Sequence, residues 1–107
     1  MGELIRQQHH FLQLLIQTTS SQRKAILHTI TRQQLRALSE IAYNILKFKI
    51  PLTASQKTSL KRQRRAIYLL ANRTLGFQQK KEGIQGKQKL VYTLVKLATV
   101  YLKSVLH

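Results

Sequence analysis

The sequence contains no cysteine, and only three of its 107 residues are acidic. Without cysteine the chain has no disulfide, no thiolate metal site and no cysteine nucleophile. The three carboxylates lie far apart along the chain, so no paired-carboxylate active site is visible. They are Glu3, Glu40 and Glu82. These absences lead us to expect a protein that is not an enzyme and needs no cofactor.

The four histidines indicate no metal site either. His9 and His10 are adjacent, so on a helix their side chains point in different directions and do not form a two-ligand face. His28 and His107 lack the supporting cysteines or carboxylates of common metal sites. We therefore expect surface histidines.

Long hydrophobic runs are also missing. The most apolar segment, residues 90–106, is interrupted by Lys96 and Lys103, which makes it short and polar for a membrane span. The N-terminus lacks a basic stretch followed by an apolar segment and a small-residue cleavage site, so we predict no secretory signal. We expect an intracellular protein that is not secreted.

What the chain does have is positive charge and apolar residues. Lysine and arginine number 19, which gives a net charge of +16, and 43% of the residues are hydrophobic. So few acids cannot pair with so many cations, and most of the cations must face solvent, counterions or a polyanion. The apolar content is too high for a disordered basic tail, so we expect a folded core.

The apolar spacing is helical almost throughout, and it predicts an all-α protein, a compact bundle of about four to five short helices. The single proline and the four glycines fall at plausible helix boundaries. We predict a helical bundle domain over residues 1–74, a flexible basic connector over 75–87 and an amphipathic C-terminal helix over 88–107. The predicted helices cover residues 3–17, 20–29, 32–47, 54–73 and 88–106.

Three of these helix starts carry the same capping signature. Thr-x-x-Gln occurs at Thr19 with Gln22, at Thr31 with Gln34 and at Thr53 with Gln56. In a capping box the hydroxyl accepts a hydrogen bond from the third helical N–H, and the glutamine side chain accepts one from the backbone of the cap. Before the last of these, Pro51 disfavours helix at the preceding residue. We therefore predict a new helix after each of the three threonines.

The helix predicted over residues 54–73 carries the most concentrated charge. With successive residues about 100° apart, its apolar residues form one arc and its cations the opposite arc. The apolar arc holds Leu60, Ala66, Ile67, Leu70 and Ala71, which we expect to pack on the helix over 32–47. The outer arc holds Lys57, Lys61, Arg62, Arg64 and Arg65 together with Tyr68.

No acid lies on that outer arc, so pairs at helical spacing cannot offset its like-charge repulsion. We interpret it as a surface that contacts nucleic-acid phosphates, with Tyr68 adding contact to sugar or base. Five further cations extend the predicted nucleic-acid-binding set: Arg73, Lys80, Lys81, Lys87 and Lys89. A weaker group surrounds the preceding helices: Arg23, Lys24, Arg32 and Arg36. Alternatively, the arc is a solvated face or a nuclear-import cluster, LKRQRR.

The C-terminal helix has a wide apolar face, which we interpret as a core helix that closes the bundle or as a dimer seam. A membrane-surface helix is the alternative interpretation. Oligomerisation through this helix or through the helix over 32–47 would make the protein an interaction module. Within the DNA-binding class, a helix-turn-helix with its turn at residues 29–31 would direct Arg32, Gln33 and Arg36 outward.

Three stretches resemble a known group of small basic proteins: QRKAIL at 22–27, QLRALSEIAYNIL at 34–46 and IPLTASQKTSLKRQRRAIYLLA at 50–71. The group is encoded by adintoviruses, by Maverick-type (Polinton) elements and by related sequences in animal genomes, and it is similar to the DNA-condensing core peptides of adenoviruses. The family's tail commonly has a glycine pair before an apolar, proline-containing segment, whereas this chain continues as GIQGKQKLVYTL. The resemblance implies a virion core protein that packs double-stranded DNA, located in the virion or the host nucleus.

Overall fold

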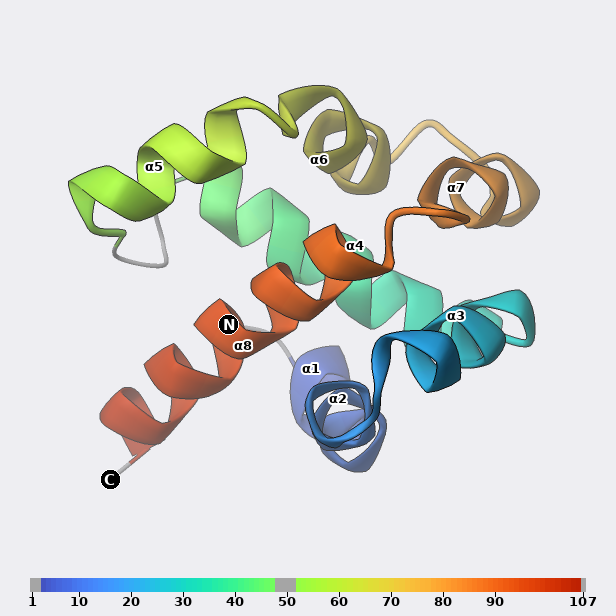
Figure 1. The fold of residues 1–107 in the computed structure, drawn as a ribbon, viewed down its shortest axis with the longest axis horizontal. Helices are drawn as coiled ribbons and strands as arrows, with labels where there is room; N and C mark the ends of the chain where they lie inside the picture. The colour runs from blue at the N-terminus through green and yellow to red at the C-terminus, as the bar shows by residue number, and fades with distance from the viewer. Residues whose placement is uncertain (1–2, 48–51, 107) are drawn as a thin grey trace.

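Helix α4 (Arg32–Leu46) lies at the centre of the fold, with the other helices arranged around it (Figure 1). It contacts α1 (Glu3–Gln7), α6 (Arg64–Ala71), α7 (Phe77–Ile84) and α8 (Gln88–Leu106). The computed structural model describes the backbone of residues 3–47 and 52–106, and the side chains of these residues up to position 100. The inner face of α4 is buried, as its apolar spacing predicted, at Leu35, Leu38, Ile41, Ala42 and Ile45.

Within the described ranges the chain forms eight helices and no strand, which confirms the all-α prediction. The remaining helices are α2 (His9–Gln17), α3 (Ser20–His28) and α5 (Ala54–Lys61). The radius of gyration is 12.7 Å, close to the value of about 13 Å for a compact domain of this length. The helices outnumber the four to five predicted, because two predicted helices are each divided and one helix was missed.

All three predicted capping boxes are present. Thr31 Oγ1 accepts from the Gln34 backbone N at 3.2 Å, and Gln34 Oε1 accepts from the Thr31 backbone N at 2.9 Å. The same pair of hydrogen bonds starts α3 at Thr19 and α5 at Thr53. These bonds satisfy backbone N–H groups that have no partner within the helix. The predicted break at Pro51 and the terminal His107 lie outside the described residues.

The helix predicted over residues 3–17 is divided at Gln8, where φ is −97° and ψ is 20°. The backbone hydrogen bonds continue across the division, from Gln8 N to Leu4 O and from Leu12 N to Gln8 O. The division is therefore a local bend, after which Phe11, Leu12 and Leu15 enter the core beside Ile5. Side-chain spacing does not detect such a bend, because the apolar residues keep their helical periodicity.

The prediction of a single helix over residues 54–73 is wrong, because a turn at Arg62 and Gln63 separates α5 from α6. Gln63 N bonds to Leu60 O, three residues earlier, which tightens the chain at this point. The bend places α6 against α4, and Ile67, Leu70 and Ala71 are buried there as predicted. The surrounding like charges provide no i,i+4 pair to hold the two segments straight.

The segment predicted as a flexible basic connector, residues 75–87, contains α7 and packs into the bundle. Gly83 lies inside this helix because α7 approaches α6 closely there. A Cβ built on Gly83 would lie 2.6 Å from a Cδ atom of Leu69. Among the glycines that the structure describes, Gly86 alone, with φ +79°, has the left-handed conformation that favours glycine, at the turn into α8. Gly83 and Gly86, two of the three glycines that suggested a linker, thus allow close packing and a tight turn.

Helix α8 closes the bundle against α2, α3 and α4, which confirms its interpretation as a core helix. Its buried residues follow helical spacing: Leu90, Val91, Leu94, Val95 and Ala98. The end of α8 extends away from the other helices (Figure 1). Among the described residues, no helix is long and apolar enough to cross a membrane.

Candidate nucleic-acid interface

The five cations of the outer arc all lie exposed on α5, α6 and the turn between them. We refer to Lys57, Lys61, Arg62, Arg64 and Arg65 as the basic surface. Because α5 and α6 are two helices that meet at a bend (Figure 1), the basic surface follows a bent path and is not a straight stripe. Tyr68 lies on α6 with 59% of its surface exposed, where its ring is free to contact a ligand.

The basic surface is held in place from its inner side. Leu60, with 6% exposure, anchors the end of α5, and Ile67 and Leu70 anchor α6 on α4. The capping box of Thr53 fixes the start of α5, with Gln56 Oε1 accepting from the Thr53 backbone N at 2.8 Å. One short segment thus combines apolar residues that face the core with cations that face solvent.

Cations elsewhere in the protein lie over aromatic rings, and each of three rings holds two of them. Tyr43 has Arg73 and Lys47 within 4.3 and 5.6 Å of its centroid, and Phe77 has Arg32 and Lys81 at 4.9 and 5.8 Å. Tyr92 holds Arg23 at 4.5 Å and Lys96 at 5.7 Å. With so few carboxylates in the chain, the ring faces take the place of ion-pair partners.

The basic surface has no such arrangement. Within the part of the chain that the structure describes, none of its five side chains donates a hydrogen bond or lies over an aromatic ring. By contrast, Arg23 donates to Gln88 Oε1 at 2.9 Å and to the carbonyl of Thr18, which joins the N-terminal helices to α8. The cations of the basic surface thus lack the ring contacts that six other cations of the described residues make.

The other predicted binding residues are not gathered in one place. Lys87 and Lys89 are exposed at the start of α8, Lys81 lies over Phe77, and Arg73 lies over Tyr43. Lys80 was predicted to lie in a flexible basic connector, whereas in the structure it belongs to helix α7. Lys80 is 8% exposed and faces the inside of the bundle from α7, because the segment is a packed helix.

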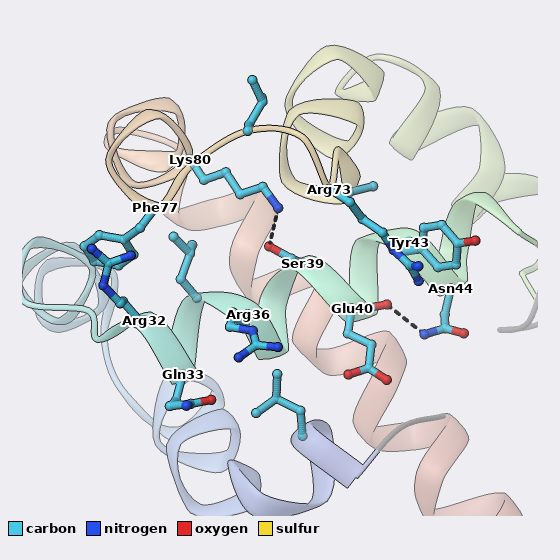
Figure 2. Close-up of a pocket in the computed structure, with 14 residues that line it drawn as sticks. Arg32, Gln33, Arg36, Ser39, Glu40, Tyr43, Asn44, Arg73, Phe77 and Lys80 are labelled. Atoms are coloured by element: carbon cyan, nitrogen blue, oxygen red, sulfur yellow. Dashed lines mark hydrogen bonds between the residues drawn. The ribbon is translucent and has the colours of Figure 1, made fainter.

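Lys80, Arg73 and two cations of α4 line a groove of about 830 Å³ between α4 and α7 (Figure 2). We call it the α4–α7 groove. The two cations from α4, Arg32 and Arg36, lie one helical turn apart. Its single carboxylate is Glu40, on the next turn of the same helix. The groove has an excess of positive charge drawn from three separate segments of the chain.

Figure 2 shows Lys80 extending from α7 toward Ser39 on α4. Its Nζ donates to Ser39 Oγ at 3.2 Å. Desolvation by burial lowers the pKa of Lys80 below its usual value, because an ammonium is less stable away from water. The groove thus contains an amine held by a neutral hydroxyl in a partly dry environment.

Sequence reasoning missed most of the groove. Arg32 and Arg36 were assigned to a weaker basic group and to the outer face of a helix-turn-helix, and Ser39, Tyr43 and Phe77 had no assigned role. One signal was available, since Phe77, Lys80 and Ile84 recur at i, i+3 and i+7, the spacing of an inward helix face. Lysine at the middle position marks a charged group where an apolar one is expected.

The helix-turn-helix interpretation placed Arg32, Gln33 and Arg36 on a face directed outward. All three are exposed, and all three line the α4–α7 groove. Helix α4 is surrounded by α1, α6, α7 and α8, so it does not project from the molecule as a separate recognition helix.

The described residues include no group of three or more histidine, cysteine, aspartate or glutamate side chains placed to hold a metal ion. His9, His10 and His28 are exposed, as predicted. Comparison of the chain with protein-family models, curated proteins and solved structures found no match. The chain is an all-α bundle with an exposed basic surface, and its function is therefore inferred from these structural features.

Proposed function

We propose that the protein binds double-stranded DNA without sequence preference, through the basic surface on α5 and α6. The observation that supports this proposal most strongly is the exposure of five neighbouring cations with no intramolecular partner among the described residues. Such a surface carries repulsion that a polyanion relieves, because each neutralised phosphate releases condensed counterions.

The residue types favour contact with the DNA backbone over base reading. Lysine and arginine bind phosphates as charge-assisted donors, and phosphate contacts carry no direct sequence information. The bent path of the basic surface follows from the turn at Arg62 and Gln63, which gives α5 and α6 different directions. Tyr68, exposed beside Arg64 and Arg65, adds an aromatic contact to sugar or base.

A net charge of +16 on 107 residues suits a protein that neutralises and compacts DNA. We propose that the protein condenses or scaffolds DNA in this way. The resemblance to small basic proteins of adintoviruses and Maverick-type elements points in the same direction, because it implies a protein that packs a double-stranded genome. In this role the helical bundle displays the basic surface, and no chemical step is required.

Matched triple variants test whether the basic surface is the binding site. The first replaces Lys57, Lys61 and Arg65 by Gln. The control replaces Arg6, Lys24 and Lys96 by Gln, which removes the same number of exposed lysines and arginines from other helices. Binding is measured by fluorescence anisotropy on two unrelated duplexes of equal length, at a fixed low salt concentration.

We expect the first variant to lose roughly tenfold or more in affinity for both duplexes, and the control to change by less than about threefold. Equal losses in the two variants would mean that net charge alone drives binding and that the basic surface is no particular site. A strong preference of the wild type for one duplex would contradict binding without sequence preference.

A further inference from the structure

Helix α7 buries a lysine where its spacing calls for an apolar residue. Phe77 is half-buried, Lys80 is 8% exposed and Ile84 is 0% exposed, on one face that packs into the bundle. Burying a charged group costs free energy unless it is paired. The one side-chain hydrogen bond of Lys80 in the described part of the chain goes to a neutral hydroxyl, Ser39 Oγ. An ammonium has further N–H donors, so Lys80 retains capacity to bind an anion.

Two guanidinium groups that lie over aromatic rings line the α4–α7 groove together with this amine. Arg73 lies over Tyr43 and Arg32 lies over Phe77, and all four residues line the groove together with Lys80 (Figure 2). A guanidinium stacked on a ring keeps its N–H groups in the plane free, and that fork matches the oxygens of a phosphate. Stacking therefore orients these cations while leaving their donors available.

A DNA duplex cannot reach Lys80, which is the deepest cation of the groove. Lys80 lies at the packed face of α7, while the rims of the groove are formed by the exposed residues Arg32, Arg36 and Arg73. Duplex DNA has a persistence length of about 150 base pairs, so a short duplex is a stiff rod that contacts surfaces and does not bend into such a groove. A small group at the end of a chain, or a free nucleotide, is able to enter.

We propose that the α4–α7 groove binds a terminal phosphate group carried by a nucleotide, with the phosphate on Lys80 and the arginines of the groove adding positive charge around it. A terminal phosphate carries a charge of about −1.5 to −2 at pH 7, more than the single charge of a backbone phosphodiester. The groove supplies four cations against one carboxylate, Glu40, so it favours the more highly charged group. Its volume of about 830 Å³ has room for a nucleotide beside the phosphate.

Two sources offer this chemistry: a free mononucleotide and the phosphorylated 5′ end of a nucleic-acid strand. The site does not depend on DNA binding by the basic surface, because the cations that form it are different. A protein in which all five residues of the basic surface are replaced by Gln therefore provides the background for the test. In that background the groove is examined without the stronger electrostatic attraction of the basic surface.

The probes are dAMP, deoxyadenosine, and a four-nucleotide single strand with either a 5′-phosphate or a 5′-hydroxyl. Binding is followed by amide chemical shifts in ¹⁵N-labelled protein at low salt. We expect the phosphorylated member of at least one pair to bind about tenfold or more tightly than its partner, with shifts at Ser39, Arg73 and Lys80. Binding by dAMP alone assigns the site to free nucleotides, and binding by the strand alone assigns it to strand ends.

The variant Lys80→Met removes the buried ammonium and is expected to weaken phosphate-dependent binding about tenfold or more, whereas Lys81→Met provides the control on the same helix. Arg36→Gln, at the exposed rim, supplies a second variant that leaves the packed face of α7 unchanged and should also weaken binding. Three results would overturn the proposal: no binding of any probe at millimolar concentration, equal binding with and without phosphate, or unchanged binding in both Lys80→Met and Arg36→Gln.

Discussion

The Nζ atom of Lys80 lies 3.2 Å from the Oγ atom of Ser39, and this hydrogen bond joins α7 to α4 across 41 positions of sequence. It is the polar contact at the centre of an otherwise apolar helix interface, between Phe77 and Ile84 on α7. The hydrogen bond offsets part of the free-energy cost of burying the amine, but it does not replace all the hydration that the ammonium loses on folding. The stability of the protein should therefore depend on which of the two partners is removed.

Replacing Lys80 by Met should raise the free energy of unfolding at pH 7 by about 1 kcal/mol, because the change removes a buried charge and keeps the side-chain length. Replacing Ser39 by Ala should lower it by about 1 kcal/mol, because the amine then loses its partner. Urea unfolding of both single variants and the double variant gives the coupling between them. If Ser39→Ala lowers the free energy of unfolding by the same amount in the Lys80→Met protein as in the wild type, the two residues do not interact.

The lowered pKa of Lys80 also predicts how stability depends on pH. Below the pKa of Lys80 in the folded protein, both folded and unfolded states carry the proton. Between that pKa and the usual value of 10.5, the folded state loses the proton first, so the free energy of unfolding rises with pH. The slope is at most about 1.4 kcal/mol per pH unit.

The comparison with Lys80→Met isolates this effect, because Glu40, Arg36, Arg73 and Tyr43, which line the same groove, are present in both proteins. The stability advantage of Lys80→Met should shrink as the pH increases from 7 to 10 in urea unfolding experiments. An advantage that stays constant over this range would show that Lys80 titrates alike in the folded and unfolded states.

Replacing Gly76 by Thr should stabilise the protein by about 0.5–1 kcal/mol. Gly76 is the N-cap of α7, with φ −80° and ψ 172°, and its backbone N already donates to Gln79 Oε1 at 3.1 Å. A threonine there would complete the fourth Thr-x-x-Gln capping box, and no atom lies within 4 Å of its Cβ. Thermal unfolding measures the gain.

Gly86→Thr serves as the control for this substitution. The space around Gly86 is equally open, but its φ of +79° strains any β-branched residue, so stability should fall by about 1–2 kcal/mol. If both glycine variants changed the unfolding temperature in the same direction, backbone conformation would not be the cause.

The three existing capping boxes should contribute unequally. Thr31→Ala removes the cap of α4, which contacts four other helices, and should lower the free energy of unfolding by about 1 kcal/mol. Thr53→Ala acts on α5, where only Leu60 is buried, so global stability should change by less than about 0.5 kcal/mol. Hydrogen exchange should instead show faster opening of α5 amides alone. Equal global losses would mean that α5 unfolds together with the core.

Much of this architecture could be predicted from local signals. The capping boxes located the starts of α3, α4 and α5, and helical spacing identified the buried faces of α4, α6 and α8. The bends at Gln8 and at Arg62–Gln63 were missed because they leave the side-chain period unchanged. Helix α7 was missed because Gly83 reads as a linker residue, and its packing against Leu69 is a property of the folded protein.

The binding residues were predictable to a different degree. The five cations of the basic surface are exposed because helical spacing placed them opposite Leu60, Ile67 and Leu70, and that relationship is local. The α4–α7 groove joins residues from α4, from the chain after α6 and from α7. Composition does not distinguish Lys80, which is buried, from its neighbour Lys81. Only the helical spacing of Lys80 with Phe77 and Ile84 indicates which of the two lysines faces the core.

The salt dependence of duplex binding tests the central claim most directly. The equilibrium binding constant is measured over a series of salt concentrations for the wild type and for the variant with all five residues of the basic surface replaced by Gln. If these residues contact phosphates, the slope of log binding constant against log salt should be less steep in the variant by about 4 to 5. Identical slopes for the two proteins would contradict DNA binding through the basic surface.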